Sequence, residues 1–132
     1  MKKVIQKRSL FVLFFSSILF LEAFPAKATM EIEVHLQEFS VDTSSQTATP
    51  GSIRFVAKNR GTEEHELVVR RKAGEHFQEF GEIEAIAPGT GKLMTVHLPP
   101  GQYELSCQIV ETEDGETVDH YKKGMHVEIA VE

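Results

Sequence analysis

Short segments in which apolar and polar residues alternate one by one constrain the fold of this chain more than any other feature. Between residues 30 and 39, Met30, Ile32, Val34 and Leu36 alternate with polar residues. Successive side chains of a β-strand point to opposite faces, so this period of two predicts a half-buried strand. Further short strands are predicted at residues 53–57, 64–71, 92–98, 102–109 and 125–131.

Turn residues separate these segments. Pro50-Gly51 and Pro99-Pro100-Gly101 lie between predicted strands and are strong turn signals. Six or seven short strands in about 100 residues, with no internal repeat, predict one all-β domain folded as a Greek-key sandwich. Residues 72–91 lack the alternation, and we expect an irregular segment there that includes a short helix.

Residues 1–28 differ in composition from the rest of the chain. Basic residues without any acid come first, an apolar run at residues 10–21 follows, and Ala26-Lys27-Ala28 comes last. This order is typical of a secretory signal peptide. We therefore expect residues 29–132 to form one exported domain, periplasmic or secreted, with no stable membrane insertion. The alternative is an uncleaved anchor, for which the run is short, because a helical span needs about 20 residues.

The predicted domain is strongly acidic. Removal of residues 1–28 leaves nine basic and 19 acidic residues, a formal net charge of −10. Nucleic-acid binding depends on neutralising phosphates with Lys and Arg, so this charge argues against a nucleic-acid partner. It would suit a basic protein partner. Equally, the charge could serve only to keep a monomeric protein soluble.

The chain contains a single cysteine, Cys107. One thiol cannot form a disulfide within its own chain. An odd cysteine in an oxidising compartment is paired between chains, reactive or bound to a metal. Taken alone, a lone cysteine is more often a small hydrophobic core residue.

Three residue types that bind soft metals fall on core-facing positions, at or near the ends of predicted strands. In each case the neighbours two positions along the strand are apolar, and alternate residues of a strand share a face. These residues are His65, Cys107 and Met125. The histidines of the other strands have the opposite parity and are predicted to face solvent. They are His35, His97 and His126, whereas His76 in the irregular segment is uncommitted.

His120 completes a candidate metal site. It lies in the loop just before the last strand, close in sequence to Met125. Two imidazoles, one thiolate and a weak thioether are the donor set of copper centres that transfer electrons. Each residue alone has an ordinary structural explanation, but their joint placement favours one copper ion held by His65, Cys107, His120 and Met125.

The order of these residues resembles the cupredoxin, or blue (type 1) copper, family. The matching pieces are Asn59-Arg60-Gly61, His65-Glu66-Leu67-Val68-Val69, Ala87-Pro88-Gly89, residues 98–105 leading to Cys107, His120-Tyr121 and Gly124-Met125. The resemblance covers roughly residues 30–132. It implies a sandwich of about seven to eight strands with copper near one end. It also implies that His65 is the upstream ligand and that Cys107, His120 and Met125 are the downstream ones.

One segment departs from the family pattern. Cupredoxins usually have the cysteine and the second histidine a few residues apart, whereas residues 108–119 separate them here. Asp114-Gly115 near the middle is a hairpin signal, so we expect a small ribbon that returns His120 to Cys107. This ribbon could alter the redox potential or give access to a second ligand. Its acids could steer a cationic partner or belong to a solvated turn; they are Glu111, Glu113, Asp114, Glu116 and Asp119.

The sequence leaves three functions open. The first is a carrier of single electrons between redox partners. The second is a copper carrier or storage protein with the same ligands, and the third is a metal-free interaction module. An enzyme is not expected, because the chain has no recognisable Ser/His/Asp set, phosphate-binding loop or second metal cluster. Asn59 and Glu66 are candidates for orienting the ligands.

Overall fold

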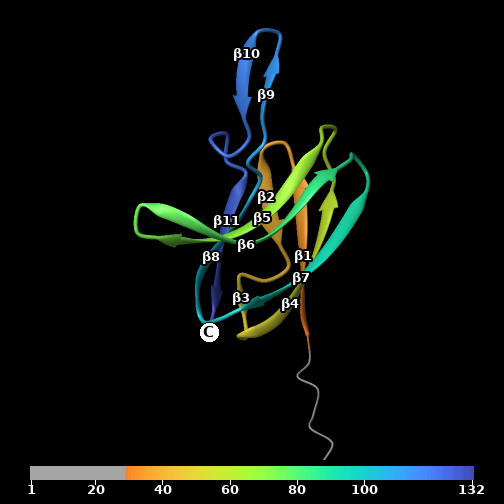
Figure 1. The fold of residues 1–132 in the computed structure, drawn as a ribbon. Coiled ribbons are helices and arrows are strands. Elements are labelled where there is room, and N and C mark those ends of the chain that lie inside the picture. Colours follow the sequence, from red (N-terminus) through yellow and green to blue (C-terminus); the bar gives the residue numbers. More distant parts are fainter. Residues whose placement is uncertain (1–28) are drawn as a thin grey trace, which may run out of the picture.

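The computed structural model describes residues 29–132, which form two β-sheets and a projecting hairpin (Figure 1). The predicted signal peptide, residues 1–28, lies outside the described residues. The strands are β1 (Met30–Gln37), β2 (Ser40–Thr43), β3 (Thr47–Ala48), β4 (Gly51–Asn59), β5 (His65–Ala73), β6 (His76–Ile86), β7 (Gly91–Leu98), β8 (Gly101–Ser106), β9 (Val110–Glu113), β10 (Glu116–Asp119) and β11 (His126–Val131). The described part has no helix, and hence none that is long and apolar enough to cross a membrane.

The two sheets contain strands that are distant in sequence. One has the order β2-β1-β4-β7, and the other has the order β3-β11-β8-β5-β6. β1 runs parallel to β4, and β3 runs parallel to β11. The remaining neighbours within the two sheets are antiparallel. This arrangement confirms the predicted all-β sandwich.

The core lies between the sheets and follows the predicted alternation. In β1, Ile32, Val34 and Leu36 are completely buried, as are Ile53 and Phe55 in the neighbouring β4. Burying one large apolar side chain stabilises a fold by roughly 1.5–3 kcal/mol. Register is therefore fixed, because a slip of one residue would turn this apolar row toward water.

The prediction for residues 72–91 was wrong. Most of this segment is β6, an edge strand of 11 residues, and it contains no helix. The pairing of β5 with β6 shifts register twice, between His65 and Leu67 and between Val69 and Arg70. Such irregularities add residues to one strand of a pair and interrupt the alternation. The alternation of apolar and polar residues is therefore absent from a segment that nevertheless forms a strand.

Three strand ends of the second sheet meet at one end of the sandwich. Val68 near the start of β5 pairs with Ser106 at the end of β8, and Ser106 pairs with His126 at the start of β11. The β9–β10 hairpin projects from this end, and the C-terminus lies at the opposite end (Figure 1). Residues that begin β5, follow β8 or precede β11 are thereby brought together.

Candidate metal centre

Two histidines and the cysteine converge at the end of the sandwich that carries the hairpin. His65, Cys107 and His120 are all completely buried, and one ligand atom of each lies within 4.8 Å of the others. The Sγ atom of Cys107 is 3.6 Å from Nδ1 of His120. The two imidazole rings have centroids 5.3 Å apart and an interplanar angle of 67°. The structure thus brings together three of the four residues that the sequence singles out as ligands.

Backbone hydrogen bonds hold these residues at the sheet ends. The Cys107 amide donates to the Met125 carbonyl at 3.0 Å, which continues the pairing of β8 with β11. The His120 amide donates to the Ile109 carbonyl at 3.0 Å and closes the base of the hairpin. The chain between Cys107 and His120 therefore leaves the sandwich and rejoins it at the same place.

The hairpin itself has the predicted form. β9 and β10 are antiparallel, with Glu113 opposite Glu116. Asp114 and Gly115 have φ values of 48° and 84°. Two consecutive residues with positive φ are the signature of the type I′ turn that Asp-Gly favours. The prediction of a small ribbon at residues 108–119 is confirmed.

A carboxylate contacts the outer nitrogen of each histidine. Nε2 of His65 lies 3.2 Å from Oε1 of Glu38, and Nε2 of His120 lies 2.8 Å from Oε1 of Glu111. A carboxylate accepts the Nε2–H of a neutral imidazole and so leaves Nδ1 as the nitrogen with a lone pair. In both rings, Nδ1 is therefore the nitrogen available to a metal.

Nδ1 of His65 is the strongest indication that these residues bind a metal. This atom is buried and has no hydrogen-bond partner in the described residues. An unsatisfied buried polar group costs roughly 1–3 kcal/mol. Burial lowers the pKa of His65 in spite of Glu38, and the nearby His120 lowers it further, so the ring is neutral and can donate its lone pair. A metal ion at Nδ1 would remove the unsatisfied group.

Cys107 is a free, completely buried thiol. Burial raises the pKa of this thiol, although backbone hydrogen bonds from Glu66 and Ile109 act in the opposite direction. The thiol is therefore protonated without a metal. Metal binding would displace the proton, and the same backbone N–H groups would then stabilise the thiolate.

This donor set fits copper. Two neutral imidazoles and a soft thiolate are ligands that copper accepts in both of its common oxidation states. Met125 is completely buried, and its amide donates to the His120 carbonyl at 3.1 Å. Its backbone therefore contacts both Cys107 and His120. Ligation by the Met125 sulfur stays a prediction.

The loop before His65 is held by a buried amide. Nδ2 of Asn59 donates to the carbonyls of Glu63 and Ile86, at 2.7 Å in each case. Oδ1 of Asn59 accepts the Gly61 amide at 2.9 Å. These contacts join β4, the loop and the end of β6, and they set the position at which β5 begins.

Glu66 restrains the chain after Cys107. Its carboxylate accepts the Gln108 amide at 2.8 Å. The side chains of Asn59 and Glu66 thus support the positions of His65 and Cys107, as the sequence suggested.

The sequence alone does not single out Glu38 or Glu111 as partners of the ligands. Glu38 lies between β1 and β2 and is distant in sequence from His65. In the sequence, Glu111 is one of five acids in the predicted hairpin segment. One signal in the sequence could have identified Glu111 as a partner of His120. Glu111 lies near the start of the predicted hairpin, and His120 directly follows its end, so the hairpin brings the two residues together.

The remaining histidines do not join the centre. His76, His97 and His126 are exposed. Nε2 of His35 lies 2.9 Å from Arg60 Nη2 and 3.3 Å from Glu33 Oε2 on the protein surface. The predicted outward orientation of the strand histidines is confirmed.

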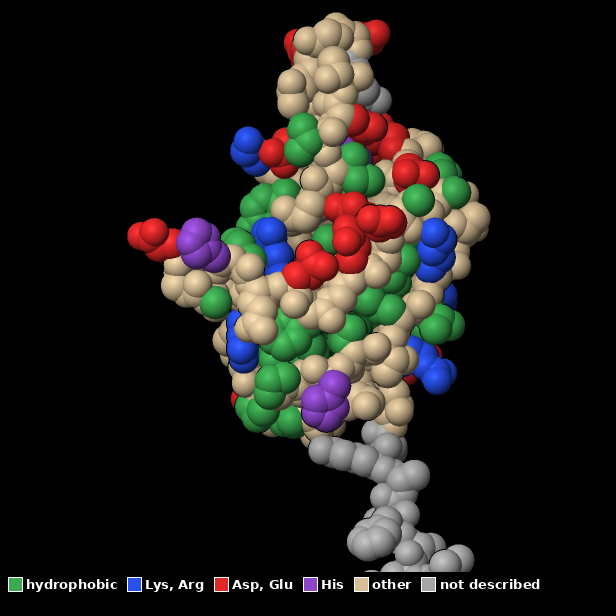
Figure 2. Space-filling model, in the orientation of Figure 1, with side chains coloured by type: hydrophobic (Ala, Val, Ile, Leu, Met, Phe, Trp, Pro, Cys, Tyr) green, Lys and Arg blue, Asp and Glu red, His purple; other side chains and the backbone are tan. Residues whose placement is uncertain are grey.

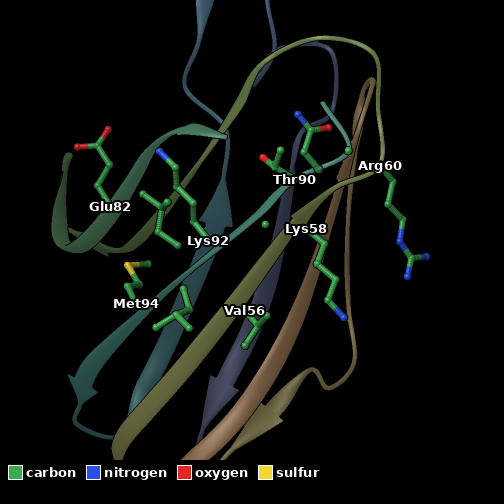
Figure 3. Close-up of a pocket in the computed structure, with 12 residues that line it drawn as sticks. Val56, Lys58, Arg60, Glu82, Thr90, Lys92 and Met94 are labelled. Atoms are coloured by element: carbon green, nitrogen blue, oxygen red, sulfur yellow. The ribbon is translucent and has the colours of Figure 1, made fainter. Parts of the chain in front are cut away.

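One hollow of the described surface lies away from this centre. It has a volume of about 1040 Å³, adjoins β4 and β7, and includes none of the four candidate ligands in its lining. Figure 3 shows Glu82 and Lys92 on one side of it and Lys58 and Arg60 on the other. The candidate functional site is therefore identified by its buried donor atoms and does not coincide with this hollow.

Solved structures share this fold. The dithionite-reduced auracyanin from Roseiflexus castenholzii matches with a TM-score of 0.57 and 18% identity over 81% of this chain and 99% of that chain. Auracyanin A, a blue copper protein of Chloroflexus aurantiacus, matches with a TM-score of 0.61 and 15% identity over 80% and 100%. No protein-family model and no curated protein matches the sequence. The described residues have the cupredoxin-like Greek-key β-sandwich fold that the resemblance implied.

Proposed function

We propose that this domain binds one copper ion and transfers single electrons between redox partners. The proposed ligands are His65, Cys107, His120 and Met125. The observation that carries the proposal is the unpartnered, buried Nδ1 atom of His65, in a group whose other members are Cys107 and His120. The shared fold with two auracyanins, one described as a blue copper protein and the other studied in a reduced form, supports the same reading.

The chain's own residues supply a prepared site. When bound, copper provides one-electron chemistry by cycling between Cu(II) and Cu(I). The two imidazoles and the thiol are held by the start of β5, the end of β8 and the base of the hairpin. Rigid placement of this kind keeps the ligands close to one geometry in both oxidation states, so little has to move when an electron is gained or lost.

Burial favours electron transfer over copper delivery. Delivery of the ion requires a partner to reach the ligands and exchange them one at a time. All four proposed ligands are completely buried. A closed site of this kind suits a protein that keeps its copper ion and passes on only the electron. We therefore propose an electron carrier in preference to an enzyme or a copper storage protein.

We further propose an exported protein with a cationic redox partner. The composition of residues 1–28 supports export. Acidic side chains gather below the hairpin and across the face shown in Figure 2. Partial burial, and then repulsion from the carboxylates of Glu66, Glu79 and Glu84, raises the pKa of Glu82 on β6. Complementary charge speeds the encounter of two proteins.

Reconstitution with copper tests the proposed function. The Cu(II)-loaded domain should bind one equivalent, absorb visible light intensely through the thiolate and show reversible one-electron voltammetry. Cys107→Ser should lose the absorption and the stoichiometric binding. Retained binding in that variant, or a colourless protein that releases Cu(I) readily, would contradict the electron-transfer assignment.

A further inference from the structure

We propose that the β9–β10 hairpin is part of the metal centre, and that Glu111 is a positioning residue. In this inference, which rests on the proposed function, Glu111 holds His120 with Nδ1 directed toward Cys107. Its negative charge also lowers the reduction potential of the bound ion. The hairpin is then a built component of the site and more than a solvated insertion.

The contacts of His120 indicate which of its ring nitrogens carries the proton. Nδ1 of its ring is 3.6 Å from Sγ of Cys107. On the other side of the ring, Nε2 is 2.8 Å from Oε1 of Glu111 and 3.7 Å from Oε2 of Glu63, so Glu111 makes the shorter contact. Nε2 is a donor to the carboxylate only when it carries the proton. The Glu111 contact therefore selects the tautomer in which Nδ1 has its lone pair and faces Cys107.

The hairpin ladder determines where Glu111 points. Glu111 is directly opposite Val118. Opposite residues of an antiparallel pair share a face. Val118 is buried, so the face that carries Glu111 is turned toward the body of the protein. The neighbouring pair, Thr112 and Thr117, lies on the other face and is exposed.

Burial makes this contact consequential. His120 is completely buried, whereas the Glu111 side chain is 39% exposed. The carboxylate covers the outer nitrogen of the ring and is itself partly solvated. A negative charge beside a ligand stabilises the more highly charged Cu(II) over Cu(I). The expected consequence is a reduction potential lower than that of the same site without the charge.

The outer nitrogen of His65 also contacts a carboxylate, but this carboxylate comes from the loop between β1 and β2. Glu38 contacts its Nε2 at 3.2 Å and also accepts the Thr62 and Glu63 amides at 2.7 and 2.8 Å. The core sandwich thus supplies the carboxylate for one histidine, and the hairpin supplies it for the other. Lengthening of the segment between Cys107 and His120 provides the strand from which Glu111 reaches the ring.

Three variants separate positioning, charge and a general effect on the hairpin. Glu111→Ala removes both the acceptor and the charge. Glu111→Gln keeps an acceptor oxygen of similar reach and removes only the charge. Glu116→Gln is the matched control, because it removes the same charge from an exposed position on β10.

The first measurement uses the metal-free protein. Nitrogen-15 NMR of the imidazoles should find His120 with its proton on Nε2 in the wild type, in Glu111→Gln and in Glu116→Gln. Glu111→Ala should lose this single tautomer. A wild-type ring with its proton on Nδ1, or an unchanged tautomer in Glu111→Ala, would overturn the positioning role whether or not the protein binds copper.

The second measurement uses the copper-loaded protein. Glu111→Ala should weaken copper binding by about 10- to 100-fold, the usual effect of losing a partner of a ligand. Glu111→Gln should lower the ratio of Cu(II) to Cu(I) affinity about tenfold, which raises a one-electron potential by about 59 mV. Glu116→Gln should change neither quantity. Equal potentials in Glu111→Gln and Glu116→Gln would overturn the charge effect, whereas a wild type that binds no copper would instead refute the proposed function.

Discussion

Sγ of Cys107 lies 3.6 Å from Nδ1 of His120, although the two residues are 13 positions apart in the sequence. The hairpin between them closes at its base through the hydrogen bond from the His120 amide to the Ile109 carbonyl. A longer connection has therefore not separated the two residues. It has added a strand, β9, that contacts the far side of the His120 ring.

Loss of a buried histidine should be far more harmful to copper binding than loss of an exposed one. His65→Gln is expected to weaken binding by more than the roughly 10- to 100-fold that loss of an outer partner costs. His97→Gln removes an exposed strand histidine and should leave binding unchanged. Competition with a chelator of known affinity measures both. Similar affinities for the two variants would exclude His65 as a ligand.

Met125→Leu tests the proposed ligand that is buried and is joined to Cys107 and His120 by backbone hydrogen bonds. The replacement nearly conserves volume, so the free energy of unfolding should fall by less than about 1.5 kcal/mol. The reduction potential should rise, because loss of a donor favours Cu(I), which accepts fewer ligands. Voltammetry and chemical denaturation give the two quantities. An unchanged potential and spectrum would leave Met125 as a core residue only.

Gly61→Ala should disturb His65 through Glu38. A Cβ atom at position 61 would collide with the Glu38 carboxylate, which would have to leave its contacts with the Thr62 and Glu63 amides. Hydrogen bonds to a charged group contribute about 1.5–3 kcal/mol, and we expect a loss of that order in the unfolding free energy. In a Glu38→Ala background the same substitution should cost much less. If the two substitutions lower the unfolding free energy additively, Gly61→Ala does not act through Glu38.

Tyr103 should make the protein sensitive to alkali. Its hydroxyl donates to the Pro99 carbonyl at 2.7 Å, and burial raises the pKa of this tyrosine even though Arg71 lowers it. A pKa raised in the folded state gives stability that is complete below the unfolded value, near pH 10, and is lost as pH rises through the folded value.

Tyr103→Phe should therefore have two measurable effects. At neutral pH it should cost about 1 kcal/mol, the contribution of one hydrogen bond. Above about pH 10 its unfolding free energy should fall less steeply than that of the wild type. Urea denaturation across this pH range measures both. Parallel curves for the two proteins would show that folding does not shift the pKa of Tyr103.

The all-β fold and three converging residues could be predicted from the sequence because both depend on local rules. Alternation in residues 30–39 places Ile32, Val34 and Leu36 on one face whatever the partner strand is. The same parity turns His65 and Cys107 inward. Asp114-Gly115 specifies its turn through backbone conformations that few other residue pairs adopt.

β6 could not be predicted in this way. The two register shifts against β5 are properties of the pair of strands, and the first of them leaves Ile83 and Ile86 buried three positions apart. Neither strand shows the shifts by itself. Only the paired structure reveals that an apparently irregular segment continues the sheet.

Residue types and their order were thus enough to determine the fold class and to point to the soft donor atoms, because strand parity acts over two residues. The carboxylate on the outer nitrogen of His65 was decided only by the tertiary structure. Glu38 and His65 are 27 positions apart and meet because β1 and β4 pair in parallel and the following loop turns back. Contacts of this kind depend on the packing of whole strands, for which no local pattern in the sequence is a signal.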